Sequence, residues 1–287
     1  MPLYHLADEL PKLREPVLVA SFDGWVDAAE AASDAVSRIG SGGALVARFD
    51  GDAIYDYRSR RPVLDVLDGR LTELRWPELA IRHANIGGRD VLIFAGAEPD
   101  LRWQELAEDV AHLALRLGVE QWISLGAVPG AVSHTMPVPV MATASEGGQL
   151  GPGDIAGPEG LLRVPSAALS AFEMAVSAAG IPAVGFFAQV PPYASIGYAA
   201  ASLALLHRLA RHLGVALDVE SLVDEERDQR QRYDAAVAGD PMLRETVERL
   251  QSAAGDMEEE RLPSGDELAR EIQRFLRRQP GAGDDEG

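Results

Sequence analysis

Short apolar runs alternate with longer amphipathic stretches up to about residue 215. The apolar runs have the length of buried strands and lie at residues 17–22, 44–49, 91–97, 121–128, 138–144 and 184–190. Several of them are apolar on both faces, which is typical of strands that helices cover on both sides. The pattern therefore predicts a sheet whose two faces are both buried.

The stretches between these runs have helical periodicity. Leucine and valine recur at spacings of four, three and four between residues 106 and 117, on one face of a helix that ends at Gly118. Alanine- and leucine-rich helices at 166–180 and 195–214 also end at glycines. This alternation of strand and helix predicts a three-layer α/β/α sandwich with a mostly parallel sheet and right-handed crossovers.

A glycine-rich segment, GSGG at residues 40–43, lies after a predicted helix and before a predicted strand. A dinucleotide-binding fingerprint has the opposite order, in which a strand leads through the glycines into a helix. We therefore interpret this segment as a turn that ends a helix.

The last quarter of the chain has no strand pattern between residues 218 and 278. It is predicted to form helices that break at Asp240-Pro241, at Gly255 and at Leu262-Pro263. The last of these helices opens with an S-x-x-E capping box at 264–267 and has an apolar face. We expect this part to pack as a small helical subdomain.

Charge supports a boundary before this region. The chain has 26 basic and 45 acidic residues and a formal net charge of −19, and residues 218–287 alone hold 20 acids and 10 arginines. We predict a core domain at 1–217, an acidic helical subdomain at 218–279 and a disordered tail at 280–287. The acidity also argues against nucleic-acid binding, which requires basic surfaces.

Composition excludes several other classes of chemistry. Lys12 is the only lysine, so a lysine-based phosphate loop is not expected, and the absence of cysteine excludes disulfides and thiolate sites. The six histidines lack metal-ligand spacing, so we expect neither metal nor cofactor. No apolar run reaches the roughly 18 residues of a membrane span, and the N-terminus lacks a signal core. We expect a cytoplasmic protein that does not bind membranes.

The first candidate site is the segment ASFDGWVDAAEAA at residues 20–32, where a strand runs into a helix. Asp23, Gly24, Trp25 and Asp27 would edge a pocket at the carboxyl end of this strand, where α/β sheets bind ligands. The alternative is structural, because a carboxylate at Asp27 stabilises the start of a helix. The acids would repel a phosphate, so we do not expect a phosphate cradle.

A cationic cluster follows the second predicted strand, in DAIYDYRSRRP at residues 52–62. Arg58, Arg60 and Arg61 stand next to Tyr57 and could clamp a carboxylate or phosphate, which guanidinium groups match. They could equally pair with the aspartates nearby or with acids on another subunit. The sequence leaves both interpretations open.

Three further loops follow strands. Glu98 and Trp103 come after the third strand, and a carboxylate in an apolar mouth beside a tryptophan could act as an acid. Ser133 and His134 lie in the loop after the fourth strand, without the G-x-S-x-G elbow of a hydrolase, and Gln189 ends the last strand. In a parallel sheet all these loops converge on one edge.

The chain resembles the proteasome assembly chaperone 2 family in its prokaryotic form. The segments that carry the resemblance are FDGWVDA at 22–28, DYRSRRP at 56–62, AGAEPDLRW at 95–103, GAVPGAVSHTMP at 126–137 and LPSGDELAREIQRFL at 262–276. The resemblance implies a phosphorylase/hydrolase-like α/β/α core, a C-terminal helical element and self-association. Eukaryotic members are scaffolds for proteasome α-rings and not enzymes. Proteins that dock in proteasome pockets often end in a hydrophobic residue, tyrosine and any residue; this chain ends Asp285-Glu286-Gly287, so we do not expect that docking mode.

Two functions from different classes follow. The first is a non-catalytic, assembly-chaperone-like protein that forms homo-oligomers, with proteasome subunits as the partner by family analogy. The alternative is a phosphorylase- or hydrolase-like enzyme for a small anionic or nucleoside-like substrate. In that case the arginines at 58, 60 and 61 would hold the anion, and Glu98 or His134 would supply acid–base chemistry.

Overall fold

The computed structural model describes residues 1–151, 154–157 and 160–261. These fall into two compact units, one of Met1–Ala236 and a second that begins at Val237. The capping box at 264–267, the break at Leu262-Pro263 and the predicted tail at 280–287 lie outside the described residues. The domain boundary at 217 stays a prediction.

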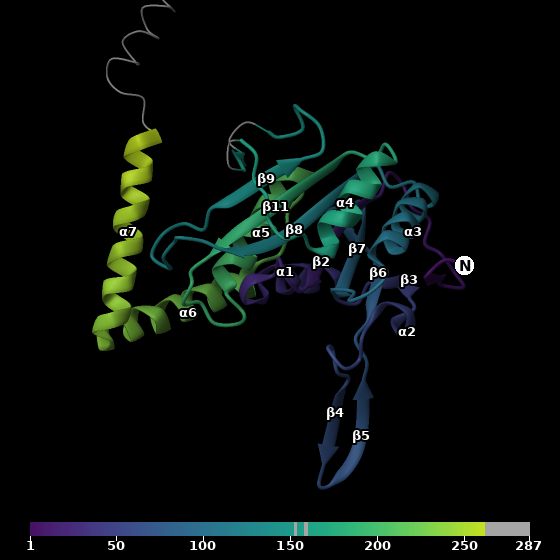
Figure 1. Cartoon of the computed structure of the whole chain (residues 1–287), viewed down its shortest axis with the longest axis horizontal. Helices are drawn as coiled ribbons and strands as arrows, with labels where there is room; N and C mark the ends of the chain where they lie inside the picture. The colour runs from purple at the N-terminus through teal and green to yellow at the C-terminus, as the bar shows by residue number, and fades with distance from the viewer. Residues whose placement is uncertain (152–153, 158–159, 262–287) are drawn as a thin grey trace, which may run out of the picture. The chain divides into compact units, whose positions relative to one another are not determined.

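The main sheet has nine strands in the described part of the chain (Figure 1). They are β1 Tyr4–Leu6, β2 Val17–Asp23, β3 Ala44–Phe49, β6 Leu79–Ile86, β7 Arg89–Ala97, β8 Gln121–Pro129, β9 Val140–Ala144, β10 Ile155–Ala156 and β11 Ala183–Val190. A separate hairpin consists of β4 Val63–Leu67 and β5 Arg70–Arg75. The helices are η1 Ala28–Glu30, α1 Ala31–Gly40, α2 Gly51–Ile54, α3 Trp103–Arg116, α4 Ala168–Ala178, α5 Ala199–Leu213, α6 Glu220–Gly239 and α7 Pro241–Arg261.

The strand order is β1-β3-β6-β7-β2-β8-β11-β9-β10. The central strands β7, β2, β8 and β11 pair in parallel, and β6 lies antiparallel between β3 and β7. The predicted α/β fold is therefore confirmed, although the margins of the sheet are more mixed than expected. Strands β3, β7, β2, β8 and β11 all point the same way, so the loops after them leave the sheet at one edge.

Helices cover both faces of this sheet, as Figure 1 shows. On one face, α3 and α4 bury a cluster around Phe94, Trp122 and Phe172. On the other, α1 and α5 bury a second cluster that contains Val19 and Phe186. Burial on both sides explains why the central strands are apolar at nearly every position.

Five predicted helix ends are confirmed, at the turn 40–43, at Gly118, Gly180 and Gly214 and at Asp240-Pro241, and one is wrong. Helix α1 ends at Gly40, and Gly42 in the following turn has a φ of +76°, which favours glycine. The break at Asp240-Pro241 separates α6 from α7. Helix α7 continues through Gly255, because one glycine lowers helix stability without ending the helix.

Candidate functional site

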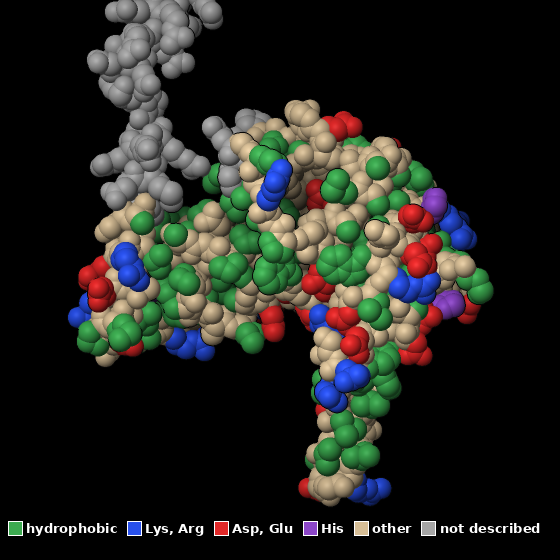
Figure 2. Space-filling view, in the orientation of Figure 1, with side chains coloured by type: hydrophobic (Ala, Val, Ile, Leu, Met, Phe, Trp, Pro, Cys, Tyr) green, Lys and Arg blue, Asp and Glu red, His purple; other side chains and the backbone are tan. Residues whose placement is uncertain are grey.

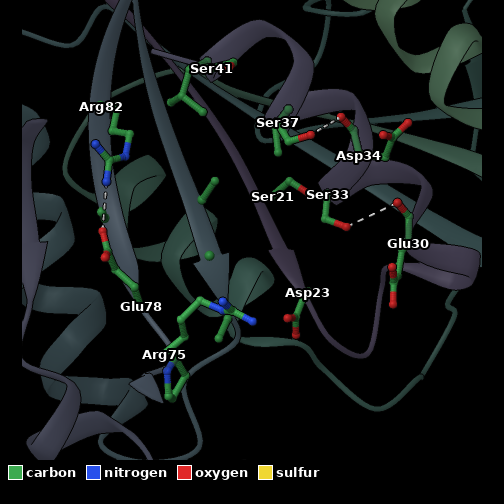
Figure 3. Close-up of a pocket in the computed structure, with 18 of the residues that line it drawn as sticks. Ser21, Asp23, Glu30, Ser33, Asp34, Ser37, Ser41, Arg75, Glu78 and Arg82 are labelled. Carbon is green, nitrogen blue, oxygen red and sulfur yellow. Dashed lines mark hydrogen bonds and ion pairs between the residues drawn. The ribbon is translucent and has the colours of Figure 1, made fainter. Parts of the chain in front are cut away.

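A groove of about 1070 Å³ lies on the α1 side of the sheet. Its floor comes from β2, β6 and β7, one wall from η1 and α1, and the other from residues at the base of the β4–β5 hairpin (Figure 3). The residues that line it include Ser21, Asp23, Arg60, Arg61, Arg75, Trp76, Glu78, Ala80, Arg82, Ile93 and Ala95.

The alternation of side chains along β2 decides which of them reach the groove. Ala20 and Phe22 belong to the core on the α3–α4 side, and Ser21 and Asp23 point to the opposite face. Ser21 is buried, and its hydroxyl has no hydrogen-bond partner among the described residues.

Asp27 holds the loop from β2 to α1 in place. Its Oδ1 accepts hydrogen bonds from the backbone N–H groups of Ala32 (2.8 Å) and Ser33 (3.2 Å), at the start of α1. The side chain is buried, its Oδ2 lacks a partner among the described residues, and desolvation raises the pKa of its carboxyl above the usual value. Asp27 therefore stabilises the helix start, at the cost of burying a carboxylate.

Glu98 joins three segments. Its Oε2 accepts from the N–H of Trp25 at 3.0 Å, and its Oε1 accepts from the N–H of Ala168 at 2.7 Å, at the first residue of α4. Helix α4 has no capping side chain of its own at Ala167, so Glu98 supplies that function from another loop. Both of its oxygens are engaged by backbone donors.

Gly24 makes the approach of Glu98 possible. A Cβ at residue 24 would lie 2.1 Å from Glu98 Oε2 and 2.8 Å from Glu98 Cβ. The glycine is therefore required by close packing of two loops.

The three arginines of the cationic cluster have different roles. Arg60 forms an ion pair with Asp23 at 2.5 Å, and its buried Nε has no partner among the described residues. Arg58 and Arg61 are exposed and form no ion pair within the part of the chain that the structure describes. Arg60 and Arg61 line the groove and Arg58 does not.

Aromatic side chains surround this end of the sheet. Trp25 is 64% exposed, and Trp76, which lines the groove, is 53% exposed. Tyr57 packs edge-on against Trp76 and donates a hydrogen bond to Asp52 (2.8 Å), and the pKa of Tyr57 is raised to about 12 by desolvation and by this carboxylate. Trp103 is half-buried and its indole N–H donates to the carbonyl of Pro99.

His134 lies in a separate cluster, against α6. The backbone N–H of His134 donates a hydrogen bond to the hydroxyl of Tyr193 at 2.8 Å. The same hydroxyl lies 2.7 Å from His134 Nδ1, and His134 Nε2 lies 3.3 Å from Asp234 Oδ1. These distances are satisfied when Tyr193 donates to Nδ1 and the Nε2–H donates to Asp234. Tyr233 packs against the imidazole. His134 thus connects the β8 loop to α6.

Ser133 and Gln189 are the other two candidate site residues in this region, and both contact neighbouring residues of the fold. Ser133 is buried and its hydroxyl lies 2.7 Å from that of Thr135. Gln189 lies near the end of β11, and its side chain packs against Gly130. A Cβ at residue 130 would lie 2.6 Å from Gln189 Oε1, so the close packing requires glycine at that position. Neither residue lines the groove.

Part of the groove was not predicted from the sequence. Strand β6 and the hairpin were missed, and with them Arg75, Trp76, Glu78 and Arg82, all of which line the groove. One signal was present, since Asp68-Gly69 joins two apolar stretches and both residues have positive φ, as in the tight turn of a hairpin.

Among the described residues, no group of three or more metal-binding side chains comes together. No helix in this part of the chain has both the length and the apolar character needed to cross a bilayer.

A comparison with models of known protein families shows which family the chain belongs to. The sequence model of the PAC2 family matches residues 21–237. The chain belongs to the PAC2 family. A proteasome-assembly chaperone homologue from Mycobacterium tuberculosis is 33% identical, with a TM-score of 0.73 over 80% of this chain and 99% of that one.

Other solved structures resemble this PAC2 protein. A protein of unknown function from Corynebacterium glutamicum is 26% identical, with a TM-score of 0.85 over 91% of this chain and 99% of that one. An archaeal proteasome activator from Pyrococcus furiosus shares the fold at 13% identity, with a TM-score of 0.59 over 82% of this chain and 99% of that one. No match is found among curated proteins.

Proposed function

We propose that this PAC2 protein is a non-catalytic, self-associating scaffold that binds a protein partner, with proteasome subunits as the first candidate. The observation that carries the proposal is the similarity to the M. tuberculosis proteasome-assembly chaperone homologue over nearly all of that chain. Membership of the PAC2 family across residues 21–237 supports the same role. The cytoplasm, where such a partner would be met, is the expected location.

The groove is the surface that we assign to the partner. Its floor is apolar at Ala80, Ile93 and Ala95, and its walls carry side chains of both charges. The Ser21 hydroxyl and the Arg60 Nε have no hydrogen-bond partner among the described residues, and both residues line this groove. A partly exposed tryptophan, Trp76, lies in its wall, and tryptophan is enriched among the residues that contribute most to protein interfaces.

The geometry favours a scaffold over the enzyme alternative. Both oxygens of Glu98 accept from backbone N–H groups, so this carboxyl is committed to holding Trp25 and α4. His134 is 3% exposed and is bonded to Tyr193 and Asp234. Each group has a partner within the fold, and no observation favours a reaction at either of them.

The test is capture of partners from the cells that express the protein. Tagged wild-type chain is purified from those cells, and co-purifying proteins are identified by mass spectrometry. We expect proteasome subunits in the captured material. Recovery of the chain alone, or of other proteins without proteasome subunits, would contradict the proposal.

Two matched variants test the groove in the same experiment. Arg61→Glu reverses an exposed charge in the groove and should lower the captured partner severalfold. Arg58→Glu reverses an exposed charge three residues away that does not line the groove, and should leave capture unchanged. If both variants change the amount of captured partner equally, the groove is not the surface that binds the partner.

A further inference from the structure

The groove occupies a position in the α1 layer that a further helix could fill. Helices α1 and α5 pack on β2, β8 and β11 and cover that part of the sheet. Between α1 and the base of the hairpin, the groove is lined by strands, by turns and by α1 itself, and by no second α-helix among the described residues. The helical layer on this face is therefore incomplete over β6 and β7.

The groove has the dimensions of a short helix. It follows α1 from Glu30 to Gly43, and the ten residues of α1 span roughly 15 Å at about 1.5 Å per residue. Over that length, a volume of about 1070 Å³ corresponds to a cross-section of roughly 70 Å², or about 9–10 Å across. An α-helix with its side chains measures about 10–12 Å across. The groove therefore has room for about three turns of a helix.

The floor of the groove suits the apolar face of such a helix. Ala80, Ile93 and Ala95 present an apolar surface, and the two alanines let a partner's side chains reach close to the sheet. Trp76 is 53% exposed in the wall and offers a large ring for those side chains to contact. Amphipathic helices bind in grooves of this kind through residues spaced three and four apart.

The two walls of the groove carry opposite charge (Figure 3). On the wall formed by η1 and α1, the charged lining residues are both acids, Glu30 and Asp34. Charged side chains of both signs gather where the hairpin leaves the sheet (Figure 2). The opposite wall of the groove, at the hairpin base and β6, has four arginines and one glutamate, which are Arg60, Arg61, Arg75, Arg82 and Glu78.

One charge on each wall is left without an ion pair. The other wall charges are already paired within the fold: Asp34 with Arg38, Arg60 with Asp23, Arg75 with Asp65 and Arg82 with Glu78. The carboxylate of Glu30 and the guanidinium of Arg61 are exposed and form no ion pair with any described residue. An occupant that complements both walls brings a cation to Glu30 and a carboxylate to Arg61.

We propose that the groove binds an amphipathic helix of a partner protein. The apolar face of this helix rests on the sheet, its basic flank faces Glu30 and its acidic flank faces Arg61. Packed beside α1 at the usual interaxial distance of about 8–10 Å, it extends the helical layer on this side of the sheet. The inference rests on the proposed function, which assigns the groove to the partner, and it names the kind of segment that the partner contributes.

The test uses two synthetic helical peptides of about four turns with the same composition and the same apolar stripe. The segregated peptide has glutamates on one flank and lysines on the other, and the mixed peptide has both residues on both flanks. Binding to the full chain is measured by fluorescence anisotropy. We expect the segregated peptide to bind at least tenfold more tightly than the mixed one.

Charge-reversed variants test which wall faces which flank. Arg61→Glu should weaken binding of the segregated peptide severalfold and strengthen binding of a peptide with lysines on both flanks. Glu30→Lys should do the reverse with glutamates on both flanks. Arg58→Glu and Glu108→Lys are the matched controls, because they change the net charge equally at exposed positions outside the groove. Thermal melting of each variant checks that the fold is retained.

A second measurement uses the natural partner. The chain has no cysteine, so Ser37→Cys places a single thiol on the α1 wall, where a photo-crosslinker can be attached. Partner residues that become linked to it should lie in one amphipathic helix. Glu108→Cys, on the other side of the sheet, should not link to that helix.

The remaining outcomes overturn the inference. If the mixed peptide binds as tightly as the segregated one, or if neither binds, the groove does not take a helix of this kind. If Arg61→Glu lowers capture of proteasome subunits while no helical peptide binds, the scaffold function stands and the inference fails. If Arg61→Glu and Glu30→Lys change sedimentation of the chain and leave peptide binding unchanged, a second copy of the chain occupies the groove. Binding of the segregated peptide without capture of proteasome subunits would support the inference and contradict the proposed function.

Discussion

At the scale of single residues, the carboxylates that looked like candidates for chemistry hold the backbone in place. Asp27 and Glu98 together accept four backbone hydrogen bonds, from Ala32, Ser33, Trp25 and Ala168. Each of these donors is at the start of a helix or in a loop, where no other backbone partner is at hand. The backbone N–H groups that donate to these carboxylates explain why acidic side chains are buried or half-buried at these two positions.

We predict that Asp27→Ala lowers the free energy of unfolding by about 0.5–2 kcal/mol, the range for loss of a side chain that caps a helix. Chemical denaturation measures the change. Asp8→Ala, at an exposed position, is the control and should be neutral. An unchanged stability together with loss of partner capture would show that Asp27 binds the partner instead.

Gly24→Ala should destabilise the protein because the new Cβ would displace Glu98 and break its bonds to Trp25 and Ala168. The expected loss is about 1–3 kcal/mol for overpacking. Gly147→Ala is the matched control, since nothing lies within 4 Å of a Cβ at that position. Equal melting temperatures for the two variants would contradict the role assigned to Gly24.

At the scale of elements, α6 is attached to the core by the buried Leu222, by the ring of Tyr233 and by several polar contacts. Leu222 is buried, but the helix is also held by Arg38 to Glu225, by Gln229 to the N–H of Ala199, and by Tyr233 to the N–H of Ser195. Such contacts lose much of their strength to water, so α6 should open before the sheet does.

Tyr233→Ala should therefore speed hydrogen exchange of α6 amides severalfold while the amides of β2 and β8 remain protected. Tyr233 accepts from Ser195 at 3.0 Å and packs on His134, and both contacts are lost in the variant. Hydrogen-exchange mass spectrometry reads the two regions separately. Arg232→Ala, the exposed neighbour, should leave exchange unchanged.

At the scale of the whole molecule, buried acids make stability depend on pH. Burial raises the pKa of Glu173 above its ordinary value, and its carboxyl accepts a hydrogen bond from Ser124 at 2.5 Å. The pKa of Asp27 is raised for the same reason. A raised pKa means that the folded state keeps its proton where the unfolded state has lost it. The contribution of each group to stability is therefore intact below the unfolded pKa and falls as pH rises through the folded pKa.

Glu173→Gln should remove part of this dependence. The glutamine keeps an acceptor for Ser124 and never ionises, so the variant should gain stability over the wild type at pH 7 and lose that gain near pH 4. Urea unfolding at both pH values measures the difference, with exposed Glu108→Gln as control. A gain that is the same at both pH values would contradict ionisation of Glu173 as the cause.

The sequence by itself determined the α/β architecture, because the period of apolar residues reports which faces of a strand or helix are buried. All six predicted strands are present, and the five loops at 23–27, 50–62, 98–103, 130–139 and 191–198 follow strands that point the same way. The groove and the roles of its neighbours needed the tertiary structure. Strand order placed β6 between β3 and β7, hairpin register put four aliphatic side chains on one face, and Glu98 met Ala168, seventy residues away, at the start of α4. Periodicity is a local property, whereas the meeting of loops depends on contacts between distant segments, and no local pattern encodes those.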